Sequence, residues 1–306
     1  MPKAWLFLHP VGKLLFREGE AMKILVTGAN GQLGKTIGRC FMEDDLVLTD
    51  INSLDITKET VVFEAIQVIK PDVIINCAAY TDVDKCEKNQ SQAYEVNARG
   101  VHNLALGASK IGCELVHIST DYVFDGKGIV ENGKRRPYQE MDQVNPKTIY
   151  GKTKLLGEQF LQETIENYYL IRTAWLYGDG FNFIKRILMQ GYSNETVSVV
   201  TDQIGTPTST DQLARLIKVL LKEKSYGSYH GSCEGSCTRY EYARAIFDRM
   251  GINKSIEPIT SKDLKQLARR PSYSVLENKR LNEKGIFKFN HWEEALVEYL
   301  EELKTL

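Results

Sequence analysis

MKILVTGANGQLG, at residues 22–34, joins a short apolar run to a turn that carries three glycines. The apolar run favours a buried strand, and the residues that follow, QLGKTIGRCFME at 32–43, have apolar positions at helical spacing. A glycine-rich turn between a strand and a helix presents free backbone N–H groups and the positive end of the helix dipole to phosphates. The stretch therefore predicts a dinucleotide-binding βα unit.

The three glycines of this turn have separate expected roles. Gly28 permits a tight turn after the strand, because glycine adopts backbone angles that other residues avoid. Gly31 lets the backbone approach a pyrophosphate, and Gly34 lets the helix pack closely on the strand. A ligand-free strand–helix turn would use the same residues, so the rest of the chain has to support the binding interpretation.

Strand-like and helix-like patterns alternate along the first half of the chain. Helical patterns occur at 58–70 and 91–112. The further apolar runs that favour strands lie at 45–50, 72–79, 114–120 and 169–178. This alternation is typical of an α/β fold, a Rossmann-like doubly wound parallel sheet with helices on both faces. Continuous apolar strands agree, because parallel strands are buried on both sides.

We expect three parts along the chain. These are a peripheral extension at 1–21, a dinucleotide-binding domain at 22–172, and a segment at 173–306 that is mainly a substrate-binding lobe, with some elements returning to the sheet. The lobe should cover the carboxyl edge of the sheet, where open α/β sheets bind ligands. The extension is too short and interrupted to span a membrane and lacks a clear signal-peptide pattern. Because Met22 opens a strand directly, we expect either that Met22 is the natural start or that the extension is peripheral.

Composition narrows the class of protein. The chain has 306 residues, of which 42% are hydrophobic and 26% charged, with a net charge of −1. These values are ordinary for a globular protein in solution, and no global basic field favours nucleic acid or an anionic membrane as a partner. We expect a cytoplasmic monomer or homodimer whose partner is a small molecule.

The six cysteines predict reduced thiols. Cys40, Cys77 and Cys113 are expected to be buried. Cys233 and Cys237 lie four residues apart, but no second Cys or His pair has zinc spacing, so we expect no metal site. Reduced thiols are typical of the cytosol.

The second strand ends at Asp50, 22 residues after Gly28. A carboxylate there can accept hydrogen bonds from an adenosine ribose and would repel a 2′-phosphate. Lys35 and Arg39 could offset that repulsion, so NADH is favoured while NADPH stays open. Thr57 is expected to cap the helix that follows.

TIYGKTK, at 148–154, places Tyr150 and Lys154 four residues apart, which is one face of a helix. A tyrosine that acts as an acid or base near neutrality needs a lowered pKa, and a lysine cation within reach lowers it. A solvated Tyr–Lys pair is the plainer interpretation of the motif alone. The strand before it ends in hydroxyls at Ser119 and Thr120, which favours a catalytic group at the carboxyl edge of the sheet.

The order of the glycine turn, the hydroxyl at the strand end and the Y-x-x-x-K motif resembles the extended short-chain dehydrogenase/reductase family. NCAAYTDVDKCE, ISTDYVFDG, NPKTIYGKTKLLGE, RTAWLYG and VTDQIGTPTST are more closely similar to its dTDP-4-dehydrorhamnose reductase branch, from Met22 to the carboxyl terminus. The resemblance implies reduction of the C4 ketone of a nucleotide sugar by NADH or NADPH.

The resemblance also implies a set of functional residues. The implied catalytic residues are Thr120, Tyr150 and Lys154, and the implied substrate contacts are Thr120, Asp121 and Trp175. The cofactor contacts expected from the motif and the resemblance are Gly28, Asn30, Gly31, Gln32, Leu33, Gly34, Asp50, Asp55, Ile56, Ala78, Ala79, Tyr80, Tyr150 and Lys154. Some members bind magnesium at a dimer interface through a glutamate on the first helix, but GKTIG at 34–38 has no carboxylate, so a magnesium-bridged dimer is not expected.

Two other functions remain open. A nucleotide-sugar 4-epimerase of the same fold would hold NAD tightly and consume no reductant. A non-catalytic dinucleotide-binding regulatory subunit would have no need for all three catalytic residues. Asp121 is followed by Tyr122, so the second carboxylate that related dehydratases use is missing.

Candidates for neutralising a substrate pyrophosphate are Arg172, Lys185, Arg186, Arg269 and Arg270.

Overall fold

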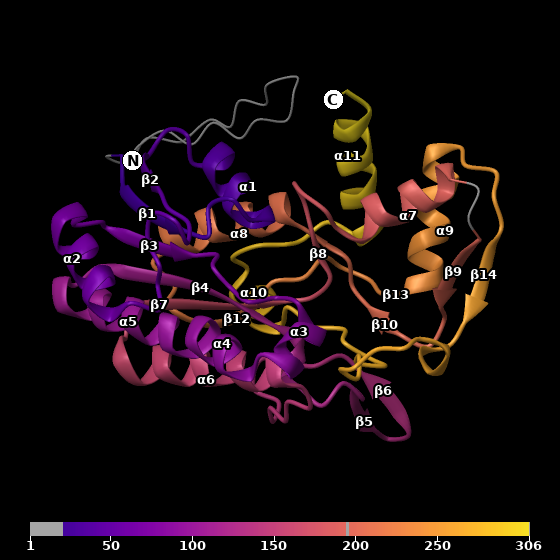
Figure 1. Cartoon of the computed structure of the whole chain (residues 1–306), viewed down its shortest axis with the longest axis horizontal. Helices are drawn as coiled ribbons and strands as arrows, with labels where there is room; N and C mark the ends of the chain where they lie inside the picture. The colour runs from indigo at the N-terminus through magenta and orange to yellow at the C-terminus, as the bar shows by residue number, and fades with distance from the viewer. Residues whose placement is uncertain (1–20, 194–195, 306) are drawn as a thin grey trace.

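The computed structural model describes residues 21–193 and 196–305. Its centre is a six-stranded sheet of order β12-β7-β4-β3-β1-β2, in which every neighbouring pair is parallel (Figure 1). The strands are β1 (Lys23–Thr27), β2 (Asp45–Leu48), β3 (Val73–Asn76), β4 (Glu114–Thr120), β7 (Tyr168–Thr173) and β12 (Gly227–His230). The predicted fold class is confirmed. The expected extension at 1–21 lies outside the described residues, apart from Ala21.

Helices cover both faces of the sheet because successive strand side chains point to opposite sides. Ile24 and Val26 belong to one hydrophobic core and Leu25 to the other. Figure 1 shows α1 and α8 above the sheet and α5 and α6 below it. The helices packed on the two faces are α1 (Gln32–Cys40) and α8 (Thr210–Glu223), and α2 (Glu59–Ile69), α5 (Gly100–Ile111) and α6 (Ile149–Thr164).

The strand order fixes where a ligand can enter. β2 and β3 lie on opposite sides of β1, so the connections that follow β1 and β3 diverge at this point of the sheet. In open α/β sheets such a switch point leaves a crevice outside the carboxyl ends of the strands. The glycine turn after β1 and the small residues after β3 therefore meet at one edge.

The carboxyl-terminal part contributes one strand, β12, to the sheet edge and otherwise forms small elements. Figure 1 places β9, β14, α7 and α9 together at one end of the molecule. The helices here are α7 (Phe183–Tyr192), α9 (Arg239–Met250), α10 (Lys279–Lys284) and α11 (Trp292–Thr305). The paired strands are β9 (Val197–Val200) with β14 (Ile256–Ile259), β10 (Ile204–Gly205) with β13 (Cys237–Thr238), and β8 (Leu176–Tyr177) with β11 (Thr208–Ser209).

Two predicted elements are interrupted. The strand expected at 169–178 divides into β7 and β8, because Trp175 has a φ of 45°, a left-handed conformation that ends strand geometry. The helix expected at 91–112 consists of α4 (Gln90–Tyr94), a π-helical turn (Glu95–Arg99) and α5. Such π turns occur frequently at functional sites.

Smaller elements complete the description. They are α3 (Val83–Lys88), the hairpin strands β5 (Ile129–Glu131) and β6 (Lys134–Arg136), and 3₁₀ turns at Asp121–Val123 and Ser261–Asp263. The predicted cap of α2 is wrong. Lys58 precedes the helix without a side-chain cap, and the Thr57 hydroxyl donates to Asp55 Oδ1 at 2.8 Å instead.

All six cysteines are free thiols. Cys113 is buried as expected, whereas Cys40 and Cys77 are only partly buried, which corrects the sequence expectation. Within residues 21–193 and 196–305, no helix is long and apolar enough to cross a membrane. The same residues contain no group of three or more His, Cys, Asp or Glu side chains arranged to hold a metal ion.

Candidate active site

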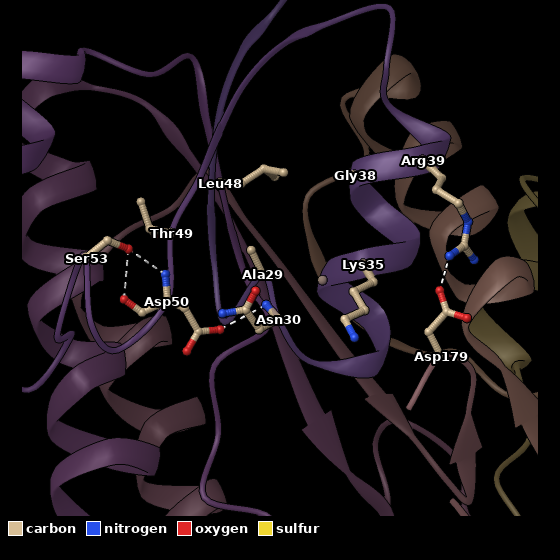
Figure 2. Close-up of a pocket in the computed structure, with 11 residues that line it drawn as sticks. Ala29, Asn30, Lys35, Gly38, Arg39, Leu48, Thr49, Asp50, Ser53 and Asp179 are labelled. Carbon is tan, nitrogen blue, oxygen red and sulfur yellow. Dashed lines mark hydrogen bonds and ion pairs between the residues drawn. The ribbon is translucent and has the colours of Figure 1, made fainter. Parts of the chain in front are cut away.

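Two clefts open at the carboxyl edge of the sheet, and the glycine turn contributes to both. The first, of about 510 Å³, lies beside α1 and the end of β2 (Figure 2). We call it the cofactor cleft; it is lined by Ala29, Asn30, Gly34, Lys35, Gly38, Arg39, Leu48, Thr49, Asp50, Ser53 and Asp179. The second, of about 370 Å³, lies where β3, β4, α6 and β8 meet. We call it the catalytic cleft.

The glycine turn is shaped by close backbone packing. Gly28 has a φ of 67°, and a Cβ atom there would lie 2.6 Å from the Ala78 nitrogen. A Cβ on Gly34 would collide with the Gly28 carbonyl, so the helix can approach the strand only with glycine at this position. Among the described residues, no side chain caps the amino terminus of α1, which leaves its first N–H groups available to an anion.

The wall of the cofactor cleft opposite α1 carries the predicted acidic residue. Asp50 accepts hydrogen bonds from the backbone nitrogens of Asn30 at 2.9 Å and of Ile51 at 2.8 Å, which ties the glycine turn to the end of β2. Figure 2 shows Arg39 directed to Asp179, away from Asp50, and Lys35 between them. Of the two basic residues considered from the sequence, Arg39 is therefore already paired.

The catalytic cleft gathers the predicted catalytic residues. α6 begins where the Thr148 hydroxyl accepts a hydrogen bond from the Gly151 nitrogen at 3.0 Å. One turn of this helix separates Tyr150 from Lys154, and both line the cleft together with Thr120 at the end of β4. The Thr120 hydroxyl acts on the pKa of Tyr150, so the two hydroxyls lie close together. The fold thus brings together a hydroxyl, a phenol and an amine from two elements.

Burial dominates the electrostatics of this cleft. It raises the pKa of Tyr150 above its ordinary value, and the nearby Thr120 hydroxyl acts in the opposite direction. Burial also lowers the pKa of Lys154 to about 8. The Lys154 amine already contacts two protein groups, because Nζ lies 2.6 Å from the Ile118 carbonyl oxygen and 3.2 Å from His117 Nε2. A lowering of the Tyr150 pKa by Lys154 therefore stays a prediction.

A buried polar chain stands behind Lys154. The Asn76 Oδ1 atom accepts from the Thr27 hydroxyl at 2.7 Å and from the Ala78 nitrogen at 3.1 Å, so its Nδ2 must be the atom that faces His117 Nδ1, 3.1 Å away. An N–H of Asn76 then donates to Nδ1, which assigns the His117 proton to Nε2. That proton points at Lys154 Nζ and favours its uncharged, accepting form.

Asp121 and Trp175, the predicted substrate contacts, also line the catalytic cleft. Asp121 Oδ1 accepts from the Thr120 hydroxyl at 3.0 Å, and burial raises the pKa of this carboxyl to about 7. Its Oδ2 atom is buried and has no hydrogen-bond partner among the described residues. A buried polar atom without a partner is costly, so this oxygen is a ready contact for a substrate hydroxyl.

The remaining predicted cofactor residues are distributed over the two clefts and the structure below them. Gly31, Gln32, Leu33 and Ala79 line the catalytic cleft. Gln32 Oε1 also accepts from the Gly178 nitrogen at 3.0 Å, which joins α1 to the segment after β8. The described linings of the two clefts do not include Gly28, Asp55, Ile56, Ala78 or Tyr80.

Some of these residues act as support. Ile56 is buried in the core below the sheet. The backbone of Tyr80 is held on both sides by Asn97, which accepts from its nitrogen at 2.8 Å and donates to its oxygen at 3.1 Å. Asn97 belongs to the π-helical turn, so the irregular helix positions the loop after β3.

Three of the five basic candidates are engaged elsewhere or exposed. Arg172 is buried in an ion pair with Glu158 at 2.7 Å, and Ser119 donates to the same carboxylate. Arg270 pairs with Asp84 at 3.0 Å. Arg186 is exposed on α7 and stacks on Phe183. Arg172 is therefore a structural residue, because its guanidinium is already neutralised.

Sequence reasoning missed three residues of the site. Arg239, the first residue of α9, lines the catalytic cleft, although no motif marks it. Asn97 binds the backbone of Tyr80, and His117 contacts Lys154. Both contacts join residues that are distant in the chain, so no motif marks them. A histidine next to the strand-end hydroxyls was the one available signal, and it is equally typical of a buried core residue.

Fold and site together define an enzyme of the extended short-chain dehydrogenase/reductase class. Residues 22–305 match the family model described as the RmlD substrate binding domain. The chain belongs to this family, as its resemblance to the dTDP-4-dehydrorhamnose reductases predicted.

Individual relatives agree over nearly the whole chain. A spore coat polysaccharide biosynthesis protein, SpsK, of Bacillus subtilis is 40% identical over 92% of this chain and 97% of its own. The structure of a dTDP-4-dehydrorhamnose reductase from Clostridium acetobutylicum is similar with a TM-score of 0.89 and 45% identity, over 92% of this chain and 100% of that one. The Bacillus anthracis dTDP-4-dehydrorhamnose reductase, solved in complex with NADP, has a TM-score of 0.87 and 39% identity, over 92% and 99% of the chains.

Proposed function

We propose that this protein is an NAD(P)H-dependent reductase that converts the C4 ketone of dTDP-4-dehydro-6-deoxy-L-mannose to the alcohol of dTDP-L-rhamnose. The observation that carries the proposal is the meeting of Thr120, Tyr150 and Lys154 in one cleft next to the glycine turn. Relatives named dTDP-4-dehydrorhamnose reductase support the substrate, and a complex of one of them with NADP supports the cofactor.

The chain fits a dinucleotide. The uncapped start of α1 would face the pyrophosphate, and the Asp50 carboxylate would accept bonds from the adenosine ribose. Lys154 would hold the nicotinamide ribose. A bound reduced nicotinamide supplies the hydride for the C4 carbonyl.

The catalytic residues would then manage the oxygen and its proton. Thr120 orients the carbonyl oxygen by a hydrogen bond, and Tyr150 donates its phenolic proton to the developing alkoxide. Asp121 accepts a bond from a sugar hydroxyl, and Trp175 closes the side of the cleft. The division into a dinucleotide-binding part up to residue 172 and a substrate lobe beyond it is part of this proposal.

The test is the absorbance of the reduced nicotinamide. The purified protein is mixed with enzymatically generated dTDP-4-dehydro-6-deoxy-L-mannose and either NADH or NADPH. We expect oxidation that matches dTDP-L-rhamnose formation one for one. No oxidation with this ketone, together with interconversion of dTDP-L-rhamnose and its C4 epimer without net use of reduced nicotinamide, would favour the 4-epimerase. Bound cofactor without any turnover would favour the regulatory subunit.

A further inference from the structure

Two arginines from different helices share one aromatic ring beside the catalytic cleft. The guanidinium carbon of Arg239, on α9, lies 4.9 Å from the Phe183 ring centroid, and that of Arg186, on α7, lies 5.2 Å from it. Arg239 also stacks on Trp175, 3.5 Å from its ring centroid. Cation–π contacts offset part of the cost of bringing two like charges together, but they satisfy no N–H donor.

Neither guanidinium has a protein anion as partner. Within residues 21–193 and 196–305, no carboxylate oxygen lies within 4.0 Å of either one, and no side-chain hydrogen bond from either is formed. Arg39, Arg136 and Arg172 show the usual behaviour, since each is paired with a carboxylate. Arginines so placed have donors available to a ligand.

The neighbouring acid does not remove this positive charge. Asp121 lines the same cleft, but burial raises its pKa to about 7, so near neutrality a large part of it is protonated. The pKa of Arg239 is lowered to about 10 by burial, and the charge of Arg186 acts in the same direction. At neutral pH both guanidinium groups are charged, and an anion between them would relieve their repulsion.

Arg239, the arginine that lines the catalytic cleft, is held in a fixed position. Trp175 has a left-handed backbone with a φ of 45°, a strained conformation that persists only where its surroundings hold it. A Cβ on Gly205 would collide with the Trp175 ring, so this ring and the guanidinium stacked on it can lie here only beside glycine. A capping box between Thr238 and Glu241 fixes the start of α9.

We propose that Arg239 and Arg186 bind the diphosphate of the nucleotide sugar. Arg239 holds it from inside the catalytic cleft and Arg186 from the exposed rim on α7. The sugar then lies toward Thr120 and Tyr150, and the nucleoside extends outward along α7. The identity of the ligand rests on the proposed function; the anion site itself rests on the two unpaired arginines.

The test measures binding of thymidine 5′-diphosphate by calorimetry to the cofactor-saturated protein. We expect Arg239→Gln to weaken binding about tenfold or more, because a charged hydrogen-bond donor is lost, and Arg186→Gln to weaken it several-fold. Arg244→Gln is the matched control, because Arg244 is an exposed arginine of the same helix and its substitution removes the same charge. The KM of the sugar nucleotide should rise with Arg239→Gln while the cofactor Kd is unchanged.

Binding of thymidine, which lacks the diphosphate, shows whether a loss of affinity depends on the phosphates. Thermal unfolding shows whether each variant is folded. Equal losses for thymidine and its diphosphate in Arg239→Gln would overturn the proposal, because the arginine would then only support the shape of the cleft. The proposal would also be overturned if Arg239→Gln and Arg186→Gln both bind thymidine 5′-diphosphate within twofold of the affinity of Arg244→Gln. Arg186→Gln keeps the test valid if Arg239→Gln does not fold. Diphosphate binding through both arginines, without turnover of the keto sugar, would leave this site standing and remove the proposed reaction.

Discussion

The cofactor cleft and the catalytic cleft are built in different ways. The first comes almost entirely from one continuous stretch, residues 29–53, and its shape is set by backbone contacts at glycine. The second is assembled from segments as distant as Gly31 and Arg239, and its character is set by buried polar side chains. Changes in the first cleft should therefore act through space and backbone angle, and changes in the second through charge and protons.

The largest effect is expected in the catalytic cleft. Tyr150→Phe removes the proposed proton donor, and a positioned acid–base group contributes about 10²- to 10⁴-fold to rate. We expect kcat to fall by about that factor while the cofactor Kd stays within twofold. Tyr122→Phe is the control, because the Tyr122 ring lies edge-on to Tyr150 at 5.4 Å in the same cleft.

A third variant, Asp121→Asn, tests whether the Asp121 carboxyl is the proton donor instead of Tyr150. If Tyr150→Phe keeps its turnover and Asp121→Asn loses it, the proton comes from the Asp121 carboxyl and the role of Tyr150 is refuted. Stopped-flow absorbance of reduced nicotinamide gives the hydride step directly.

The next effect tests the cofactor cleft. Gly28→Ala places a methyl group against the Ala78 backbone at a φ of 67°. We expect a loss of about 1–3 kcal/mol in the free energy of unfolding and weaker cofactor binding. Gly112→Ala has a similar φ of 75° but no atom within 4 Å of its Cβ, so it should lose only about 1 kcal/mol of stability and no cofactor affinity. Equal stability losses in both variants would show that crowding at Gly28 is unimportant.

Asp121 should leave a mark on the pH dependence of stability. Its folded pKa is about 7 and its ordinary value is 3.8, so between these values the folded state binds more protons than the unfolded state. The contribution of this carboxyl to stability is present below the lower value and is lost as the pH rises through 7, at no more than about 1.4 kcal/mol per pH unit.

Asp121→Asn has no such titration. We expect the difference in unfolding free energy between wild type and Asp121→Asn to shift toward the variant as the pH is raised from 4 to 8. Urea unfolding of the cofactor-free proteins measures it. Parallel curves for the two proteins would mean that Asp121 is ionised in the folded state.

A smaller effect is expected for cofactor choice. Asp50→Ala removes a ribose acceptor and the partner of the Asn30 nitrogen, so kcat/KM for NADH should fall about threefold to tenfold, and less for NADPH. Lys35→Ala should lower kcat/KM more for NADPH than for NADH. Lys35 is the basic residue of this cleft that has no carboxylate partner among the described residues, so it is available to a 2′-phosphate. Equal losses for both cofactors in Asp50→Ala would reduce its role to holding the glycine turn.

The smallest signal is spectroscopic and requires no mutation. The orientation of Asn76 predicts that His117 carries its proton on Nε2. Burial lowers the pKa of His117 well below 6.5, so this neutral form should persist at pH 6. ¹⁵N chemical shifts of the imidazole in the cofactor-free protein report the tautomer, and a protonated Nδ1 would contradict the network behind Lys154.

The sequence by itself determined the parts that depend on local geometry. The glycine turn, the parallel strands of the first half and the pairing of Tyr150 with Lys154 on one helix face all follow from residues close together in the chain. The cofactor cleft is the clearest case, because Gly28 and Gly34 are required by contacts within one βα unit and with the neighbouring strand end.

Only the tertiary structure decided which polar groups are free and which are already paired. Arg172 and Arg239 look alike in the sequence, yet Glu158 neutralises the first, whereas the second lines the catalytic cleft with no ion pair to any described residue. The π-helical turn that carries Asn97 and the break at Trp175 likewise depend on distant partners. The physical reason is that burial and long-range contacts set the charge and availability of a side chain, and neither is encoded by spacing along the chain.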